Sequence, residues 1–241
     1  MSERTALILL PGLLCDARLW KSQADALGDI ADIIIADMTL DDTMAGMAAR
    51  ALDGAPARFA LAGLSMGGYV AFEIMRQASE KVTKLALLDT GARSDSPEQT
   101  LRRRDLIALA DRGEFNAVSP RLLPLFLHKS RLSDNALIDE ITDMANSVGK
   151  AAFLRQQKAI MGRPDSRGDL VDIECPTLVV CGRQDVLTPP ELSEEIGTLI
   201  PGAELTLIDD CGHLSTMERP TAVTATIRSW LTAPVASCSR R

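Results

Sequence analysis

The stretch Gly63-Leu64-Ser65-Met66-Gly67-Gly68 places one serine between glycines that lie two residues away on either side. This G-x-S-x-G pattern alone is weak, because average composition produces it in roughly one chain of this length in ten. Its surroundings are more specific. An apolar, strand-like run, RFALAG (58–63), leads into the serine, and a helix-like run, YVAFEIM (69–75), follows it. Strand, tight turn and helix around G-x-S-x-G are typical of a nucleophile elbow, which exposes the serine hydroxyl for reaction.

The glycines of this turn have a steric explanation. An elbow forces Ser65 into a strained backbone conformation between a strand and a helix. Side chains at Gly63 and Gly67 would collide with the neighbouring strand and helix, so both positions need glycine. We expect the turn to project the Ser65 hydroxyl above the edge of a sheet. A helix N-terminus should lie beneath it and favour negative charge there.

A serine hydroxyl is a poor nucleophile until a base removes its proton. The chain has two histidines that could be this base, His128 and His213. His128 lies in a stretch with helical patterning, and we interpret it as a structural or surface residue. His213 lies in CGHLSTMERP (211–220), directly after the strand-like run AELTLIDD (203–210). Because a loop at the end of a sheet strand can approach the serine, we predict that His213 is the catalytic base.

The base in turn needs a carboxylate that orients its ring and stabilises its cation. Asp185 ends the strand-like run TLVVCGRQD (177–185) and is the preferred acid. Asp89 ends another such run, LALLD (85–89), and remains the alternative. Glu218 follows His213 closely, and we expect it to cap the last helix. The sequence therefore predicts a triad of serine, histidine and aspartate, with Asp185 favoured over Asp89.

Short apolar runs alternate with helical stretches along most of the chain. Strands joined by helices predict a parallel sheet that is covered by helices on both faces, which is an α/β architecture. The predicted strands are TALILLPG (5–12), ADIIIADM (31–38), ARFALAGLS (57–65), KVTKLALLDT (81–90), CPTLVVCGRQD (175–185) and AELTLIDDCGH (203–213).

The stretch 94–168 breaks this alternation, since it contains no clear strand. It opens on Ser96-Pro97-Glu98-Gln99, the pattern of a capped helix start with serine at the N-cap, proline at N1 and glutamine at N3. Helical periodicity returns later in the stretch, and Gly149 can end that helix. We predict an all-helical insertion at 94–168 within an α/β core formed by residues 1–93 and 169–241.

The charge composition of the chain indicates which classes of binding partner to expect. Lys and Arg number 26 against 33 Asp and Glu, which gives a net charge of −7. Nucleic acids and anionic membranes are bound by clustered cations, so we expect neither as a partner. We interpret the one basic run, Arg102-Arg103-Arg104, as the solvated face of a helix. Five cysteines without metal-ligand spacing, and an N-terminus without a signal-peptide pattern, predict a cytoplasmic protein with reduced thiols and no membrane span.

Four motifs together resemble the α/β-hydrolase superfamily, over essentially the whole chain except the insertion. They are GLSMGG (63–68), GRQDVLTPP (182–190), CGHLSTMERP (211–220) and LLPGLLCD (9–16). The order Ser65, Asp185, His213 along the chain is also the order of that family. The resemblance implies the α/β-hydrolase fold, a mostly parallel sheet flanked by helices, in which residues 94–168 form a helical lid.

The residue types at and after the nucleophile position indicate which members of the superfamily the chain resembles. A serine is similar to the nucleophile of hydrolases and esterases, whereas dehalogenases and epoxide hydrolases carry aspartate at that position. Met66, directly after the serine, resembles the elbow of cofactor-free haloperoxidases, enol-lactonases and related esterases.

The resemblance also implies an oxyanion hole built from two backbone amides. One belongs to Met66, the residue after the nucleophile. The other lies in the loop after the first strand, where relatives usually carry His-Gly and the next residue donates. Here the dipeptide is Pro11-Gly12, so the expected donor is Leu13. Proline has no imidazole to brace the loop, but the donor is a backbone amide and survives the change.

The reaction expected from these residues is hydrolysis of a small or medium ester, lactone or thioester through an acyl-enzyme on Ser65. The Leu, Ile, Ala and Met of the insertion favour an apolar acyl or alcohol group. No metal or organic cofactor is expected, since the chain lacks H-x-x-E-H and G-x-G-x-x-G. Two alternatives stay open: the same triad supports C–C bond hydrolysis or perhydrolysis, and the fold also serves in non-catalytic ligand-binding proteins.

Overall fold

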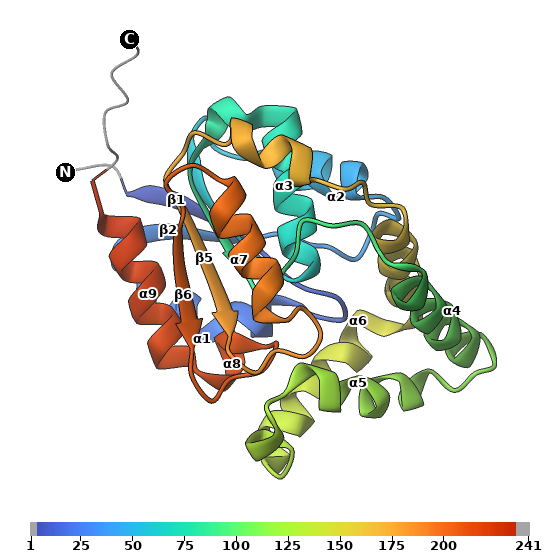
Figure 1. Ribbon diagram of the computed structural model, residues 1–241. Coiled ribbons are helices and arrows are strands. Elements are labelled where there is room, and N and C mark those ends of the chain that lie inside the picture. The colour runs from blue at the N-terminus through green and yellow to red at the C-terminus, as the bar shows by residue number, and fades with distance from the viewer. Residues whose placement is uncertain (1–3, 235–241) are drawn as a thin grey trace.

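A single parallel sheet forms the centre of the protein (Figure 1). The computed structural model describes residues 4–234; residues 1–3 and 235–241 lie outside the described part. Six strands lie in the order β2-β1-β3-β4-β5-β6, and every neighbouring pair is parallel. They are β1 (Thr5–Leu10), β2 (Ala31–Ile35), β3 (Phe59–Leu64), β4 (Val82–Leu88), β5 (Thr177–Gly182) and β6 (Glu204–Ile208). Each strand lies within a run that the sequence predicted, so the α/β fold is confirmed.

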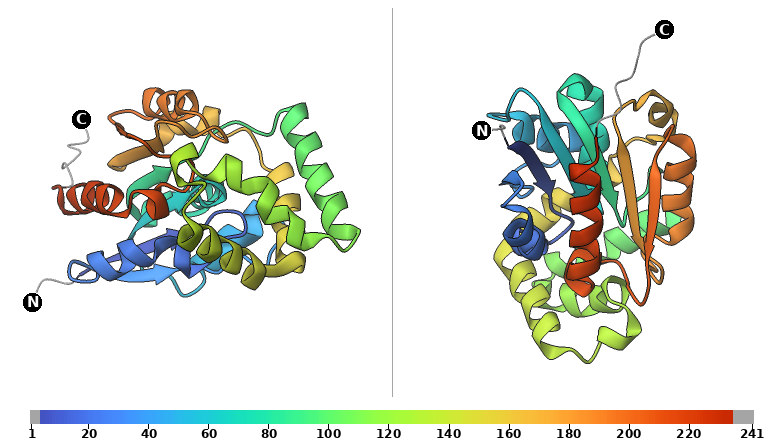
Figure 2. Two further views of the ribbon diagram at one scale, coloured as in Figure 1. Left: turned by 90° about the horizontal axis from the view of Figure 1, so that it is seen from below. Right: turned by 90° about the vertical axis from the view of Figure 1, so that its left-hand side faces the viewer.

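Helices cover both faces of this sheet (Figure 2). One face packs against α1 (Lys21–Leu27) and α9 (Pro220–Thr232). The other packs against α2 (Met44–Leu52), α3 (Met66–Ala78) and α7 (Pro190–Leu199). The two layers explain why the strands are apolar almost throughout, since a strand buried on both faces has no side for water.

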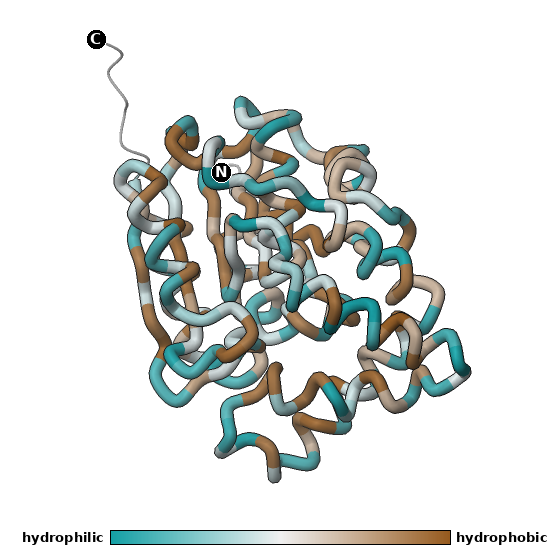
Figure 3. Tube along the Cα trace, turned by 45° about the vertical axis from the view of Figure 1, so that its right-hand side comes forward, coloured by the Kyte–Doolittle hydropathy of each residue, from teal (hydrophilic) through white to brown (hydrophobic). Residues whose placement is uncertain are grey.

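Alternate residues of the four central strands, β1, β3, β4 and β5, enter two separate hydrophobic cores. In β1, Leu7 and Leu9 belong to the core under α1 and α9, whereas Ile8 and Leu10 belong to the core under α2, α3 and α7. This alternation follows from the two-residue repeat of an extended chain. In Figure 3, many of the central strand segments are therefore brown (hydrophobic), while the helices alternate between brown and teal.

Residues 94–168, which we call the helical segment, contain no strand. Their main helices are α4 (Pro97–Asp111), α5 (Val118–Phe126) and α6 (Asn135–Met161). All three lie beyond the ends of the strands at which the arrowheads point (Figures 1 and 2). The helical segment thus lies at the carboxyl edge of the sheet, the edge at which α/β proteins place their sites.

Two local features of the helical segment agree with its sequence. At the start of α4, Ser96 Oγ accepts a hydrogen bond from the Gln99 amide at 3.2 Å, and Gln99 Oε1 accepts one from the Ser96 amide at 2.9 Å. This is the predicted capping box. Inside α6, Gly149 has φ 78° and ψ 167°, which breaks the helix. The expected end at Gly149 is therefore a kink, after which a further helical stretch continues to Met161.

Short helices complete the described chain. They are α8 (Ser215–Glu218) and the 3₁₀ helices η1 (Ala17–Trp20), η2 (Ser79–Lys81), η3 (Phe115–Ala117), η4 (Lys129–Arg131) and η5 (Arg167–Asp172). None of the helices between residues 4 and 234 is long and apolar enough to cross a membrane. The four cysteines in this part of the chain are free thiols, and Cys238 lies outside it.

Candidate active site

Ser65 lies in the turn between β3 and α3 in a strained conformation, with φ 54° and ψ −114°. Residues other than glycine rarely adopt a positive φ, and those that do cluster at functional sites. The turn is tight as well. A Cβ atom on Gly63 would lie 2.3 Å from the Gly67 oxygen, and one on Gly67 would lie 2.1 Å from the Leu10 oxygen. The steric reason for the two glycines is therefore confirmed.

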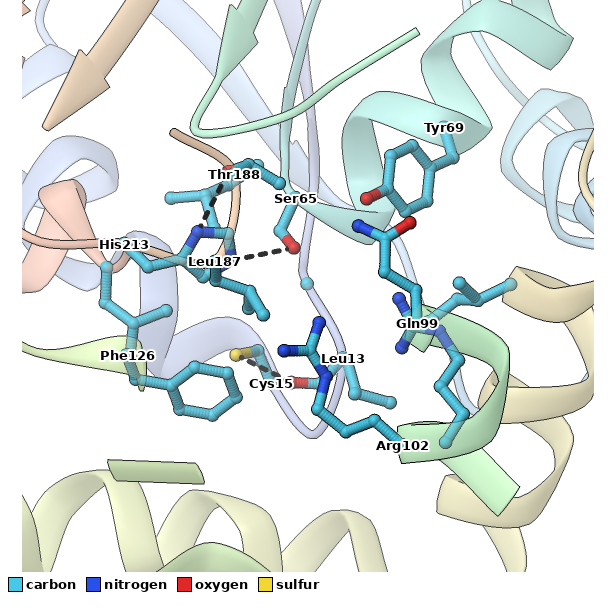
Figure 4. A pocket seen from close by; sticks show the side chains of 15 residues that line it. Leu13, Cys15, Ser65, Tyr69, Gln99, Arg102, Phe126, Leu187, Thr188 and His213 are labelled. Atoms are coloured by element: carbon cyan, nitrogen blue, oxygen red, sulfur yellow. Dashed lines mark hydrogen bonds between the residues drawn. The ribbon is translucent and has the colours of Figure 1, made fainter. Parts of the chain in front are cut away.

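The structure brings Ser65, His213 and Asp185 together at the carboxyl edge of the sheet. Ser65 Oγ lies 2.9 Å from His213 Nε2 (Figure 4). On the other side of the ring, His213 Nδ1 lies 2.7 Å from Asp185 Oδ2. Their exposed fractions are 9%, 1% and 2%. When Nδ1–H donates to the carboxylate, Nε2 is left to accept the serine proton. This is the geometry of a nucleophile, its base and an orienting acid.

The Asp185 carboxylate is fixed by several donors. Its Oδ1 accepts the amides of Leu187 at 2.8 Å and Thr188 at 3.0 Å, and its Oδ2 accepts the Thr188 hydroxyl at 2.7 Å. The same hydroxyl lies 3.1 Å from His213 Nδ1. A buried carboxylate is tolerated when its oxygens are satisfied in this way, and the bonds also fix its direction. Thr188 was not predicted from the sequence, although an aspartate that bonds amides two and three residues later is a known turn pattern.

Asp89 lies beside Asp185 but makes different contacts. Its Oδ1 accepts the Gly182 amide at 2.8 Å, and its Oδ2 accepts the Ser215 hydroxyl. Within the described residues it makes no hydrogen bond to the His213 ring. Burial, together with the negative charge of Asp185, raises the pKa of Asp89 to about 8. Of these two aspartates, only Asp185 therefore hydrogen-bonds to the His213 ring within residues 4–234.

The same corner holds a cluster of metal-ligand types, Asp89, Cys181 and Asp185, whose ligand atoms lie within 4.8 Å of one another. Hydrogen bonds already occupy all four carboxylate oxygens. Burial also raises the pKa of the Cys181 thiol far above its usual range. A metal ion would have to break those bonds and deprotonate that thiol. The cluster therefore fits a hydrogen-bonded network better than a metal centre.

The helical segment contacts His213 directly. The amides of His213 and Leu214 both donate to the Phe126 carbonyl, at 3.0 and 3.1 Å. The Phe126 ring also stacks on the imidazole, with centroids 5.9 Å apart and planes 19° apart. Burial is the largest single influence on the pKa of His213 and lowers it. The charge and hydrogen bond of Asp185, with smaller contributions from Asp89 and Glu218, together leave that pKa above its ordinary value. The His213 imidazole thus lies between Phe126 of α5 and the Asp185 carboxylate.

Glu218 holds the loop that carries His213. It is 2% exposed, and its two oxygens accept the Gly212 amide at 2.9 Å and the His128 amide at 2.7 Å. Burial raises the pKa of Glu218. The expectation that Glu218 caps the last helix is wrong, because α9 has no side-chain cap and Glu218 ends α8. The His128 ring contacts Ser130 Oγ at 2.7 Å, as expected of a structural histidine.

The loop after β1 carries the predicted oxyanion donor. Leu13 lines the pocket at Ser65, and the next residue, Leu14, has φ 60° and donates its amide to Gln156 Oε1 at 3.0 Å. Met66 is the first residue of α3, where an amide has no acceptor within its own helix. In the part of the chain that is described, neither the Leu13 nor the Met66 amide donates a hydrogen bond. Gln156 was not predicted, because 142 residues separate it from Leu14.

A narrow pocket leads to the Ser65 hydroxyl (Figure 4). The space within the pocket and its mouth is about 480 Å³, open solvent included. The core and the helical segment both contribute to its wall. Besides Ser65 and His213, the lining residues are Gly12, Leu13, Cys15, Leu64, Tyr69, Gln99, Arg102, Arg103, Phe126, Ile160, Leu187, Thr188 and Leu214.

The basic run of α4 is not one solvated face, which corrects the interpretation from sequence. Arg102 and Arg103 line the pocket, whereas Arg104 is exposed and does not. Arg103 Nε lies 2.7 Å from Asp95, and its Nη1 donates to Gln157 at 3.0 Å. Consecutive residues of a helix point about 100° apart, so three neighbouring arginines cannot share one environment.

Comparison with known proteins agrees with this architecture. Residues 7–226 match the family model described as "Alpha/beta hydrolase family". The "Putative non-heme bromoperoxidase BpoC" of Mycobacterium tuberculosis (strain ATCC 25618 / H37Rv) is 33% identical over 178 residues, which is 71% of this chain and 66% of the relative.

Solved structures agree as well. A thermophilic esterase from Thermogutta terrifontis, with malate bound, superposes with a TM-score of 0.86 and 31% identity, covering 94% of this chain and 89% of its own. The enol-lactonase from Burkholderia xenovorans LB400 gives a TM-score of 0.87 at 24% identity and covers 96% and 93%. At that identity the second likeness concerns the fold alone.

Proposed function

Because the chain belongs to the alpha/beta hydrolase family, we propose that it is a serine hydrolase that cleaves a small or medium carboxylic ester, lactone or thioester through an acyl-enzyme on Ser65. The observation that carries this proposal is the continuous hydrogen-bonded path from Ser65 through His213 to Asp185. An esterase among the structural relatives, at 31% identity, supports the ester as the bond that is cleaved.

In the first step Ser65 Oγ attacks the carbonyl carbon of the substrate. The Oγ–H proton passes to His213 Nε2, the new Oγ–C bond forms, and the carbonyl electron pair moves onto the oxygen. Asp185 Oδ2 stabilises the imidazolium through Nδ1–H. The intermediate then collapses, the C–O bond to the alcohol breaks, and His213 returns its proton to the leaving oxygen. The product of this step is an ester of Ser65.

In the second step water takes the place of the alcohol. His213 Nε2 removes a proton from the water, whose oxygen attacks the acyl carbon. Collapse of the second intermediate breaks the Oγ–C bond, and the proton returns to Ser65 Oγ. The acid leaves, and both Ser65 and His213 regain their starting protonation states.

The oxyanion of both intermediates is proposed to bind the amides of Leu13 and Met66. Both residues adjoin Ser65 or line its pocket, and neither amide has an acceptor within residues 4–234. The N-terminus of α3 adds a favourable dipole at this point. The bond from Leu14 to Gln156 supports the same assignment, because it fixes the loop beside Leu13.

The helical segment is proposed to act as a lid over this site. Gln99 and Arg102 of α4 and Phe126 of α5 line the pocket, so the segment forms a wall between Ser65 and solvent. Such a wall limits the size of the acyl group and restricts the entry of water.

The test is hydrolysis of p-nitrophenyl esters of increasing acyl length by the wild type and by Ser65→Ala. We expect turnover by the wild type that falls as the acyl chain outgrows the pocket, and no turnover above background by Ser65→Ala. Ser147→Ala is the matched control, because Ser147 is exposed on α6 and should leave turnover unchanged. Equal turnover by wild type and Ser65→Ala would contradict the proposal. If the wild type cleaves a C–C bond in a diketone but cleaves no ester, diketones would replace esters as the proposed substrate class.

A further inference from the structure

The wall that α4 contributes to the pocket is positively charged. Gln99, Arg102 and Arg103 stand at positions i, i+3 and i+4 of α4, which lie on the same face of a helix, and all three line the pocket. None of the lining residues is an aspartate or a glutamate. This charge is opposite to that of the chain as a whole, which carries a net −7.

One of the two arginines already has a carboxylate partner. Arg103 pairs with Asp95 at 2.7 Å and bonds to Gln157 at 3.0 Å. The Asp95 side chain is almost fully buried and also pairs with Arg163 at 2.6 Å, so two guanidiniums share one carboxylate. These bonds hold the Arg103 guanidinium against Asp95 and Gln157. Arg102, in contrast, has no carboxylate within 4.0 Å anywhere in residues 4–234.

The close view of the pocket shows where these side chains point (Figure 4). Arg102 extends from α4 into the pocket toward Leu13, beneath the Ser65 hydroxyl. The Gln99 amide points toward Tyr69, and its oxygen is held by the Ser96 amide at 2.9 Å. The Gln99 amide nitrogen and the Arg102 guanidinium are thus donors on the pocket wall opposite the nucleophile.

We propose that the substrate carries a carboxylate, and that this carboxylate pairs with the Arg102 guanidinium while Ser65 attacks the ester or lactone carbonyl. This inference rests on the proposed function and names its substrate class: half-esters, or lactones with an acidic side chain. A guanidinium donates two parallel hydrogen bonds to a carboxylate and binds it in a fixed orientation. Arg102 is then a specificity-determining residue.

The pocket favours one carboxylate over a larger polyanion. Of the two arginines that line it, only Arg102 has no carboxylate partner among residues 4–234. A nucleotide-bearing thioester carries several phosphate charges and needs several cations. A single guanidinium matches a single carboxylate.

The test compares pairs of esters in which a carboxylate in one member is replaced by a methyl group in the other. For an anionic acyl group the pair is methyl hydrogen glutarate and methyl pentanoate. For an anionic leaving group it is 3-acetoxypropionate and propyl acetate. We expect the wild type to favour the anionic member of at least one pair in kcat/KM, and the preference to shrink as salt rises from about 0.05 to about 0.5 M.

The variant Arg102→Gln should lower the anionic-to-neutral ratio of kcat/KM by about 10- to 100-fold, the range for a lost hydrogen bond to a charged group. Most of the loss should appear as a higher KM for the anionic ester. Arg104→Gln is the matched control, since it removes the same charge from the same helix but outside the pocket. Its ratio should equal that of the wild type.

A wild type that prefers the neutral ester in both pairs contradicts the inference, and so does an equal fall in the ratio for both arginine variants. If no ester is turned over, the proposed function fails, but this result alone does not decide whether Arg102 binds a carboxylate. Binding of methyl hydrogen glutarate to Ser65→Ala, measured by calorimetry, then still decides the role of Arg102. Adding Arg102→Gln should weaken this binding by about tenfold or more, and unchanged affinity would overturn the inference.

Discussion

The two walls of the pocket are built differently. On the sheet side, Ser65, Asp185 and His213 are at most 9% exposed, and each has hydrogen-bond partners in the core. On the side of the helical segment, Arg102 is exposed and has no charged partner among residues 4–234. Buried hydrogen bonds fix the side chains on the sheet side of the pocket. The helical segment, in contrast, presents a long side chain that a ligand can orient.

We therefore expect the sheet side to carry out the reaction and the helical segment to select the substrate. Attack on a carbonyl needs atoms held within a few tenths of an ångström, which buried and fully bonded groups provide. Choice among substrates needs only a favourable contact at a distance from the reacting bond. Changes in the sheet wall should therefore remove the reaction, and changes in α4 should redirect it.

The largest expected effect comes from the base. His213→Ala should lower kcat by about 10³-fold or more, because Ser65 then has no group to take its proton. His128→Ala, which removes the only other histidine, should change kcat little, since its ring contacts Ser130 outside the pocket. The measurement is kcat for one p-nitrophenyl ester with both variants. Similar losses in the two would show that the histidine has been assigned wrongly.

The acid should have the next largest effect. Asp185→Asn keeps the shape of the side chain but removes the charge that stabilises the His213 imidazolium, and it favours the wrong ring tautomer. The analogous change in a serine protease costs about 10⁴ in kcat, and we expect a loss of about 10² or more here. Circular dichroism should show that the variant is folded. A folded Asp185→Asn with kcat near wild type would exclude Asp185 as the acid.

The pH dependence should report the environment of the base. His213 must be neutral to accept the serine proton, and Asp185 raises its pKa despite burial. A raised pKa keeps the imidazole protonated at higher pH, so kcat/KM should fall on the acid side of a midpoint above about 6.5, the usual value for histidine. A kcat/KM profile from pH 5 to 9 measures this midpoint. A midpoint clearly below that value would mean that burial outweighs Asp185.

The smallest expected effect belongs to Asp89. Asp89→Asn keeps an acceptor for the Gly182 amide and does not touch the ring of His213, so kcat should stay within about threefold of wild type. A folded, inactive Asp89→Asn beside a folded, active Asp185→Asn would move the acid to Asp89.

The Asp89 pKa adds a signature in stability. A pKa of about 8 in the folded state exceeds the unfolded value, so the folded protein holds a proton that the unfolded chain releases between about pH 4 and pH 8. The free energy of unfolding should therefore fall as pH rises through this window. Denaturant titrations should show a weaker fall in Asp89→Asn, and an unchanged fall would contradict the raised pKa.

The two walls also differ in how far sequence predicts them. The strands and the positions of Ser65, Asp185 and His213 follow from local patterns: apolar runs mark the strands, and parallel strands deliver their carboxyl ends to one edge. The contact between Gln156 and Leu14 joins residues 142 apart in sequence, so no local sequence pattern predicts it.

The basic run of α4 shows the same limit. Three consecutive arginines predict an exposed helical face, yet the direction of each depends on how α4 rotates against the core. That rotation is set by packing and by the Asp95 ion pairs, which a single sequence does not display.

Ser65 is proposed to be the activated nucleophile, and a covalent probe of serine hydrolases tests this assignment. A fluorophosphonate probe should add one adduct to the wild type, which peptide mapping by mass spectrometry should place on Ser65, and Ser65→Ala should remain unlabelled. The strained turn and the 2.9 Å contact with His213 predict this result. An adduct of equal yield on Ser65→Ala, or an adduct on another serine of the wild type, would contradict the claim.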